Sequence, residues 1–438
     1  MPPPSRNANY RSAQGMLPIG VYGSGFLGTV ISACLSDFGT PVFCCDQDSE
    51  RMLARARGEV PFHEKDLQEV IRRNVRVGRL VYSTDLQKLV PNAQFLFLAQ
   101  DSPAEIDELA VSVAKLMTKE ATLILATPVP VGTASRIERK LKDQKLRVTV
   151  ISQPTFLTDG CAVEDFNWPE RIILGTNSEA AVKAMKQLYR PLVMRGVPVA
   201  SMSFESAELV RQASTAFLAA KISFINELAG LCEKVKADAV DVAMGMGLDK
   251  KKIGPRCLQP GSVFAGPFAE GDLEALAELA RQNNVSLKIL EAAREVNRTV
   301  ADSLMDKIAS AVNPVAGKEV GMLGLAFKPN TNSVTGSSSL CLARNLLSKG
   351  AKVRAYDPVA IPQAKAELEA VRYCDSAYAV AEGVDALVVG TGWLEFRDLD
   401  FARIKRLLKK PIIVDTKNLL DGPSLRQMGF QYIRVGRR

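Results

Sequence analysis

The longest hydrophobic pattern in the chain, residues 203–237, predicts a single long helix. Residues 205–229 contain neither proline nor glycine, and Ser203 is placed to cap the helix N-terminus. The middle of the segment is apolar on nearly every side, which indicates burial on several faces. The pattern is typical of a core helix, and it also suits a spine that joins two domains or two subunits.

Short apolar runs alternate with helical patterns on both sides of this segment, as they do in parallel α/β sheets. The strands predicted before it are 17–22, 41–45, 95–99, 123–126, 148–152 and 171–175, and those after it are 320–325, 352–356, 386–390 and 412–415. Further helices are predicted at 273–282, 287–312 and 337–349. We therefore expect an α/β fold with two Rossmann-like doubly wound domains joined by a long central helix.

These patterns also predict the domain boundaries. We expect a flexible N-terminal arm at 1–16, a first Rossmann domain at 17–200, a central helical domain at 201–313 and a second Rossmann-like domain at 318–438. The segment 313–317 contains proline and glycine and is typical of a linker.

A glycine-rich loop follows the first predicted strand and opens a helix. Gly23 permits the turn, Gly25 lets the backbone approach a pyrophosphate, and Gly28 lets helix and strand pack closely. A lone GxGxxG is a weak signal, but here the second strand ends on Asp46, eighteen residues after Gly28, which makes the pattern strong. Asp46 suits a ribose 2′-hydroxyl and would repel a 2′-phosphate, so the predicted cofactor is NAD rather than NADP. The expected cofactor contacts are Gly23, Gly25, Phe26, Leu27, Gly28, Asp46 and Arg51.

Composition narrows the class of protein. The formal charge of +8 suits an anionic ligand but is too dispersed to indicate nucleic acid. The eight cysteines form no CxxC pair, which favours a reducing compartment, and a single histidine, His63, excludes a multi-histidine metal site. No stretch reaches the roughly 18 unbroken apolar residues of a membrane span, and the N-terminus has no apolar signal core. We expect a cytoplasmic protein with no metal, no nucleic-acid partner and no membrane partner.

Several further motifs follow in order along the chain. They include PFHE at 61–64, VPVGT at 129–133, PTFLTDG at 154–160, Asn226-Glu227, GLAFKPNT at 324–331 and YDP at 356–358. With the glycine loop, they resemble the UDP-glucose/GDP-mannose dehydrogenase family over about residues 17–418. The resemblance implies an NAD domain, a C-terminal domain that binds a nucleotide-sugar diphosphate, and a homodimer formed through the 203–237 helix. Such enzymes oxidise a sugar C6 alcohol twice, to a carboxylate, through a cysteine thiolate that forms a thioester.

The chain departs from the family pattern where this chemistry is expected. In the loop 260–272 the family's nucleophilic cysteine falls on Phe268, and only Asp272 remains of the catalytic group. The family's catalytic lysine, asparagine and glutamate correspond to Arg211, Thr215 and Thr155. Other replaced positions are Pro128, Gln153, Gly271 and Lys417. The departures imply that the two-step oxidation was lost, whereas the glycine loop and Asp46 imply that NAD binding was kept.

Two hypotheses for the function stay open. The first is an NAD-dependent oxidoreductase that makes a single hydride transfer on a nucleotide sugar or a similar anionic alcohol. The second is a catalytically inactive protein that binds NAD or a nucleotide sugar, or regulates a partner. An ordinary UDP-glucose 6-dehydrogenase requires a different alignment of the loop 260–272.

Asp272 is either a base or an N-cap for a helix that starts at Leu273. The substrate contacts implied by the resemblance are Phe156, Leu157, Arg211, Phe264 and Lys328.

Overall fold

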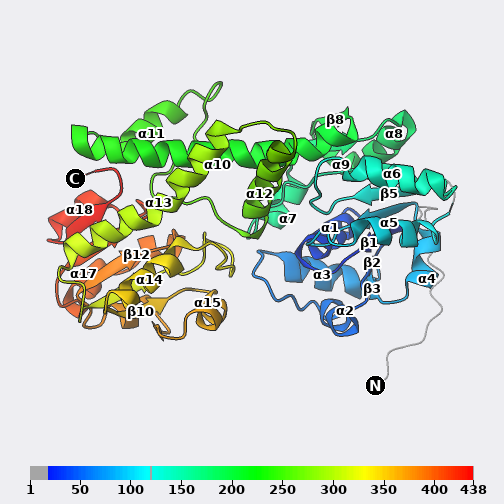
Figure 1. Cartoon of the computed structure of the whole chain (residues 1–438). Helices are drawn as coiled ribbons and strands as arrows, with labels where there is room; N and C mark the ends of the chain where they lie inside the picture. The colour runs from blue at the N-terminus through cyan, green and yellow to red at the C-terminus, as the bar shows by residue number, and fades with distance from the viewer. Residues whose placement is uncertain (1–17, 119–120, 438) are drawn as a thin grey trace, which may run out of the picture. The chain divides into compact units, whose positions relative to one another are not determined.

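The computed structural model describes residues 18–118 and 121–437, and the side chains of Pro267 and Phe268 are outside this description. The expected arm at 1–16 therefore lies outside the described residues. The chain divides into two compact units, Met1–Gln212 and Ala213–Arg438. Helix α10 (Phe204–Val235) contributes residues to both units and is drawn as one long helix in Figure 1.

The first unit contains an eight-stranded sheet in the order β3-β2-β1-β4-β5-β6-β7-β8. The strands are β1 (Ile19–Tyr22), β2 (Val42–Cys45), β3 (Leu80–Ser83), β4 (Phe95–Leu98), β5 (Thr122–Leu125), β6 (Thr149–Ser152), β7 (Ile172–Gly175) and β8 (Val199–Met202). All neighbours are parallel except β6 and β7. The order reverses between β1 and β4, and ligands of such sheets bind at the carboxyl ends of the strands at this point.

The helices of the first unit connect these parallel strands. They are α1 (Phe26–Asp37), α2 (Ser49–Ala56), α3 (Leu67–Arg76), α4 (Leu86–Leu89), α5 (Ile106–Ala114), α6 (Thr133–Asp143), α7 (Ala162–Asn167), α8 (Glu179–Leu188) and α9 (Arg190–Val193). Helix α1 packs against α3 and α7, whereas α5 packs against α6. Strands β1, β2, β4 and β5 are buried along their whole length, as expected for a sheet covered on both faces.

The second unit has a six-stranded parallel sheet in the order β11-β10-β9-β12-β13-β14. Its strands are β9 (Glu319–Leu323), β10 (Lys352–Tyr356), β11 (Arg372–Tyr373), β12 (Ala386–Val389), β13 (Ile412–Asp415) and β14 (Gln431–Arg434). Its helices, besides its part of α10, are α11 (Ala239–Gly247), α12 (Pro267–Gln282), α13 (Lys288–Ala311), α14 (Ser338–Ser348), α15 (Ile361–Glu367), α16 (Ala377–Ala381), α17 (Phe401–Leu407) and α18 (Gly422–Gln427). Helix α13 packs on α14, and both contribute to the main core of this unit.

The predicted fold class is confirmed: each unit has a Rossmann-like sheet, and a long helix lies between them in the sequence. The predicted N-cap of that helix is also confirmed, because Ser203 Oγ accepts a hydrogen bond of 3.2 Å from the amide of Ser206. One expectation is wrong. Helix α12 begins at Pro267, so Asp272 lies inside the helix and does not cap it. A proline at the first helical position suits this earlier start, since its fixed φ favours the helix and it has no amide to satisfy.

Among the described residues, one helix has the length and composition of a membrane-crossing segment, and it is α10. Its most apolar window has a mean hydropathy of 1.3. The core helix of a globular protein meets the same criterion, so this is only a weak indication of a membrane span.

Candidate functional site

The loop between β1 and α1 has the close packing that its glycines predict. Gly23 has a φ of +108°, which favours glycine. A Cβ on Gly28 would lie 1.9 Å from the carbonyl oxygen of Gly23. Only glycine at position 28 therefore lets α1 begin so close to the end of β1.

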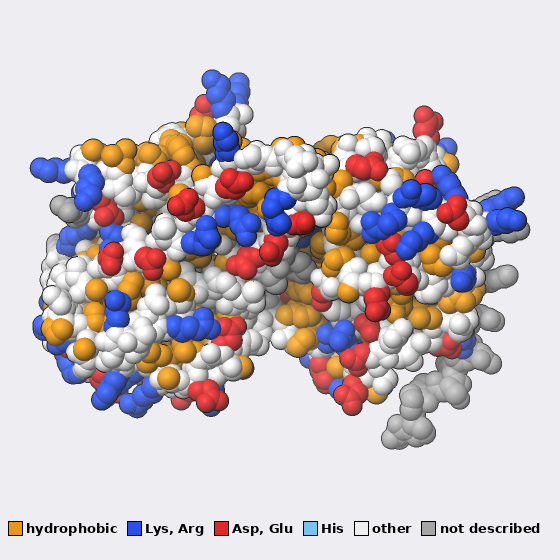
Figure 2. All heavy atoms as spheres, viewed as in Figure 1, with side chains coloured by type: hydrophobic (Ala, Val, Ile, Leu, Met, Phe, Trp, Pro, Cys, Tyr) orange, Lys and Arg blue, Asp and Glu red, His pale blue; other side chains and the backbone are white. Residues whose placement is uncertain are grey.

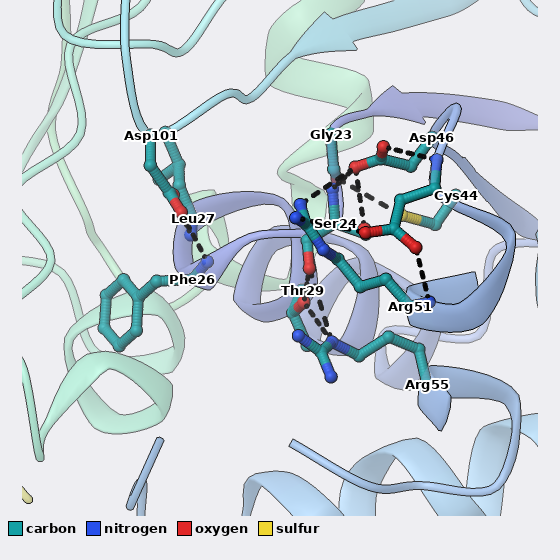
Figure 3. A network of polar contacts seen from close by, with 11 residues as sticks. Gly23, Ser24, Phe26, Leu27, Thr29, Cys44, Asp46, Arg51, Arg55 and Asp101 are labelled. Carbon is teal, nitrogen blue, oxygen red and sulfur yellow. Dashed lines mark hydrogen bonds and ion pairs between the residues drawn. The ribbon is translucent and has the colours of Figure 1, made fainter. Parts of the chain in front are cut away.

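Asp46, directly after β2, is tied to this loop. Its Oδ2 accepts hydrogen bonds from the amide of Ser24 at 2.8 Å and from the Ser24 hydroxyl at 2.7 Å. Arg51 Nη1 lies 3.5 Å from the same oxygen (Figure 3). Burial alone would raise the pKa of Asp46, but these hydrogen bonds, one from the amide of Asp48 and the charge of Arg51 together lower it. The carboxylate is therefore ionised at neutral pH and held beside the glycine loop, as recognition of a ribose hydroxyl requires.

A second carboxylate, Asp101, lies at the N-terminus of α1. Its Oδ2 accepts a hydrogen bond of 3.0 Å from the amide of Phe26, and its Oδ1 accepts one of 3.1 Å from the amide of Leu27 (Figure 3). This residue was not predicted from the sequence. A signal was present, because Asp101 comes shortly after β4, which pairs with β1, and the carboxyl ends of neighbouring parallel strands meet at one edge.

These residues fit a dinucleotide cofactor. The amides of Phe26 and Leu27 already bind an anionic group, and Gly25 has no side chain that would block the approach of a phosphate. Gly23, Gly25, Phe26, Leu27, Gly28, Asp46 and Arg51 would hold the cofactor, and they come from the loop after β1, the start of α1 and the segment from the end of β2 into α2.

The VPVGT motif has a structural role at the start of α6. The amides of Gly132 and Ala134 donate to the carboxylate of Glu208 at 2.6 and 2.8 Å. Burial raises the pKa of Glu208 to about 7. Glu208 thus caps α6 from α10 and fixes the N-terminal part of the long helix against the first unit.

The candidate substrate residues of the first unit lie in the segment 154–157 and on α10. Arg211 Nη1 donates a hydrogen bond to the backbone carbonyl of Thr155 and lies 3.4 Å from the Thr155 hydroxyl oxygen. The guanidinium of Arg171 lies 4.1 Å from the ring centre of Phe156. Phe156 and Leu157 are half-buried. Arg211 and Thr155, which the sequence analysis singled out, are therefore in direct contact.

In the second unit the loop 259–264 is fixed by side chains from three elements. Asn226 of α10 accepts from the amide of Gly261 at 2.8 Å and donates to the carbonyl of Ser262 at 2.6 Å. Asn297 of α13 bonds both backbone groups of Phe264, at 2.8 and 2.9 Å. Lys417, which follows β13, donates to the carbonyl of Gly261 at 3.0 Å. The backbone of this loop is therefore held in one conformation.

The remaining candidates of the second unit lie around this loop. The Thr215 hydroxyl is 3.0 Å from Asp272 Oδ2, and Asp272 is buried. Phe264 packs partly buried against Ala219, Leu273 and Leu290. Lys328 is half-buried, with its ammonium 5.8 Å from the ring centre of Phe327. The backbone of Phe268 lies in the first turn of α12, and its side chain is outside the described residues.

Lys417 is a fully buried ammonium group with few partners of opposite charge. Burial lowers its pKa to about 8, although Asp415 opposes this shift. Besides Gly261, its ammonium lies 3.3 Å from the Ser338 hydroxyl oxygen. Asp415 is occupied by other donors, because it accepts from the amides of Leu419 and Leu420 and from the Tyr432 hydroxyl, each at 2.8 Å.

Comparison with known proteins places all parts of the chain in one group. Models of the UDP-glucose/GDP-mannose dehydrogenase family match residues 17–193 (NAD binding domain), 205–299 (central domain) and 321–422 (UDP binding domain). The chain is 33% identical to UDP-glucose 6-dehydrogenase TuaD of Bacillus subtilis, over 96% of this chain and 94% of that protein. It is 34% identical to UDP-glucose 6-dehydrogenase of Rhizobium meliloti, over 96% and 100%.

Solved structures agree with these matches. A UDP-glucose dehydrogenase from Pyrobaculum islandicum superposes with a TM-score of 0.87 at 27% identity, over 98% of this chain and 99% of that one. A UDP-D-ManNAc dehydrogenase from Pyrococcus horikoshii has a TM-score of 0.82 at 21% identity, over 96% and 99%, and shows the shared fold.

Proposed function

Given that the chain belongs to the UDP-glucose/GDP-mannose dehydrogenase family, whose cofactor is NAD, we propose that it makes a single hydride transfer on a nucleotide sugar or a similar anionic alcohol. In this proposal it does not carry out the two-step oxidation to a uronate. The observation that carries the proposal is the contact of Arg211 with Thr155. At these positions the family has a lysine and a glutamate, whereas an arginine stays protonated near neutral pH and a threonine is not a base.

The first oxidation step needs only a hydride acceptor and a base. When bound, NAD accepts the hydride from the carbon that carries the substrate hydroxyl. Asp272 is the residue that would take the hydroxyl proton, and the Thr215 hydroxyl, 3.0 Å away, would orient its carboxylate. The product of this step is an aldehyde or a ketone. The hydroxyl proton goes to Asp272, and the electron pair of the broken C–H bond leaves with the hydride.

The second oxidation step needs a nucleophile that this chain does not place at the family's position. An aldehyde carbon gives up a hydride readily only after a nucleophile has made it tetrahedral. The family uses a cysteine there, and Phe268 has no group that can add to a carbonyl. The proposed reaction therefore stops after one hydride.

Each unit, taken by itself, has residues that suit part of a nucleotide sugar. The match of residues 321–422 to a UDP binding domain supports a nucleotide sugar as ligand. The half-buried ammonium of Lys328 suits a diphosphate. Phe156, Leu157 and Phe264 offer half-buried apolar surfaces, and Arg211 offers a fixed cation, for the sugar.

The protein is also proposed to form a homodimer through α10. Large apolar side chains are exposed on this helix, among them Phe217 at 67% and Leu231 at 56%, and they continue with Met244 on α11 and Leu248 directly after it. Figure 2 shows hydrophobic side chains gathered along the edge formed by α10 and α11. A groove of about 430 Å³ beside Phe217 and Phe224 would receive side chains of a second copy.

The unpaired state of most cysteines supports our proposal that the protein works in the reducing cytoplasm.

An inactive binding protein is the second candidate function, and the loss of the family's proton-transfer groups at Thr155, Arg211 and Thr215 favours it. A panel of nucleotide sugars deuterated at every carbon of the sugar separates the two candidates. An oxidoreductase would transfer deuterium to NAD, and mass spectrometry of the cofactor would detect it even if the reaction reverses. Saturable binding of cofactor and sugar with no deuterium transfer for any sugar would establish the inactive protein instead.

A further inference from the structure

The carboxylate of Asp101 occupies the place where a dinucleotide presents its pyrophosphate. Helix α1 has twelve residues, and its N-cap, Gly25, has no side chain that could bind the free amides of the first turn. Asp101 binds them instead, with Oδ2 on the amide of Phe26 and Oδ1 on the amide of Leu27. In Rossmann folds, these first amides of the helix are the donors that bind the pyrophosphate.

The space beside Gly25 supports the same assignment. A Cβ built on Gly25 would lie 2.0 Å from Asp101 Oδ2. Because Gly25 has no side chain, an anion can approach the backbone here, and the anion that does so in this structure is the Asp101 carboxylate of the chain itself. A pyrophosphate and the Asp101 carboxylate would need the same two N–H groups and carry charge of the same sign.

We propose that Asp101 is a built-in competitor of the cofactor: its carboxylate binds the amides of Phe26 and Leu27 in the cofactor-free chain and leaves them when the pyrophosphate binds. The inference rests on the proposed function only in that the chain binds NAD. Asp101 follows β4 in an exposed loop, so its side chain has solvent into which it can turn. The effect is to weaken cofactor binding without removing any residue of the cofactor site.

This competition has a chemical signature. It acts on ligands that carry a pyrophosphate, such as NAD and ADP-ribose, because only these need the two amides. Adenosine has no phosphate, so its affinity should not depend on Asp101. A purely structural role as the cap of α1 would predict the opposite pattern, namely lower stability of the free chain and no gain in affinity for any ligand.

The test is calorimetric titration of the full-length protein with NAD, ADP-ribose and adenosine, for the wild type and for Asp101→Asn, Asp101→Ala and Asp101→Glu. We expect Asp101→Asn and Asp101→Ala to bind NAD and ADP-ribose about 10-fold more tightly, which corresponds to about 1.4 kcal/mol. Asp101→Glu keeps the charge and should bind them no more tightly than the wild type. The matched control is Asp400→Asn, since Asp400 caps α17 through the amide of Arg403 in the other unit.

The outcomes separate this inference from the proposed function. Unchanged or weaker NAD binding by both Asp101→Asn and Asp101→Ala, with normal NAD binding by the wild type, would overturn the inference alone. An equal gain for adenosine would also overturn it, because the effect would not depend on the pyrophosphate. If neither the wild type nor any variant binds NAD, the inference and the NAD-dependent function both fail.

Discussion

At the scale of single residues, the cofactor site depends on how its carboxylates are paired. Asp46 is held by Ser24 and lies beside Arg51, so it stays ionised where an adenosine ribose would bind. Asp101 binds the amides that a pyrophosphate would need. The first carboxylate therefore favours NAD over NADP, and the second weakens both cofactors equally.

Removing Asp46 should change the cofactor preference. Asp46→Ala removes the negative charge that would repel a 2′-phosphate. It also leaves Arg51 with one carboxylate partner fewer. We expect the ratio of NAD affinity to NADP affinity to fall by about 10-fold or more, since each factor of ten corresponds to about 1.4 kcal/mol. Titration calorimetry with both cofactors measures the ratio.

The control for this change is Asp48→Ala, because Asp48 also pairs with Arg51 and caps α2 but has no contact with Ser24. Its NAD to NADP ratio should stay near that of the wild type. A wild type that binds NADP as tightly as NAD would show that Asp46 does not select the cofactor.

Lys417 should make the stability of the second unit depend on pH. Its folded pKa of about 8 lies below the 10.5 of a free lysine, so the folded state binds the proton less strongly. The resulting penalty is present below pH 8 and disappears as the pH rises from 8 toward 10.5. Between pH 7.5 and 9.5 the unfolding free energy of the wild type should rise by about 2 kcal/mol relative to Lys417→Met.

Urea unfolding can report this unit alone if Trp393 is the only tryptophan, in a Trp168→Phe background. The exposed Lys352 supplies the control, and Lys352→Met should show no such difference between the two pH values. A difference between wild type and Lys417→Met that stays constant over this range would mean that the Lys417 ammonium is not destabilised by burial.

At the scale of elements, the sequence predicts those that have a strong pattern of their own. The strands β1, β4, β5 and β9 were predictable because they are short, mainly apolar and buried, and the long helix α10 was predictable because residues 205–229 contain neither proline nor glycine. Strands β3, β8, β11 and β14 were missed. β8 and β14 are only partly buried and contain both polar and apolar residues. These strands are therefore defined by their pairing with a neighbouring strand, because they have no clear hydrophobic pattern of their own.

The candidate site was predictable to the same extent. The glycine loop and Asp46 follow from local sequence, because a strand, a turn and a helix fix their relation. Asp101 and the pairing of Arg211 with Thr155 depend on contacts between residues more than fifty positions apart. The first contact is set by the order of the strands in the sheet and the second by the packing of α10 on the segment after β6, and no local pattern contains either.

The fixed loop 259–264 gives a prediction at this scale. Asn226→Ala removes the two hydrogen bonds that tie Gly261 and Ser262 to α10. Backbone amides in 259–264 should then exchange with deuterium at least several-fold faster, while the sheets keep their protection, because only local contacts are lost. Asn345→Ala on α14 is the control and should leave this loop unchanged. Equal exchange in wild type and Asn226→Ala would show that Asn226 does not hold the loop.

At the scale of the whole molecule, the apolar surface of α10 and α11 is the feature that a single chain leaves uncovered. Phe217, Phe224 and Leu231 are exposed, and monomeric proteins rarely expose a contiguous apolar patch of this kind. A second copy that presents the same surface would bury both patches, as twofold symmetry allows.

Light scattering of the purified protein at micromolar concentration should therefore give the mass of a dimer. Phe217→Glu combined with Phe224→Glu places charges on this surface and should shift the mass toward the 47.5 kDa monomer. The control is Leu53→Glu, at an exposed position on α2 of the first unit, and it should leave the dimer intact. A wild-type protein with the mass of a monomer would contradict the proposed homodimer.

A single hydride transfer is tested by the number of NADH molecules formed per nucleotide sugar consumed, with the product mass recorded in the same reaction. The wild type should form at most one NADH per sugar and no uronate. Phe268→Cys alone should not restore uronate formation, because the thiol step needs general-base help beyond Asp272, commonly worth about 10²-fold or more, and Thr155, Arg211 and Thr215 cannot act as bases near neutral pH. Two NADH per sugar with a uronate product from the wild type would contradict the account.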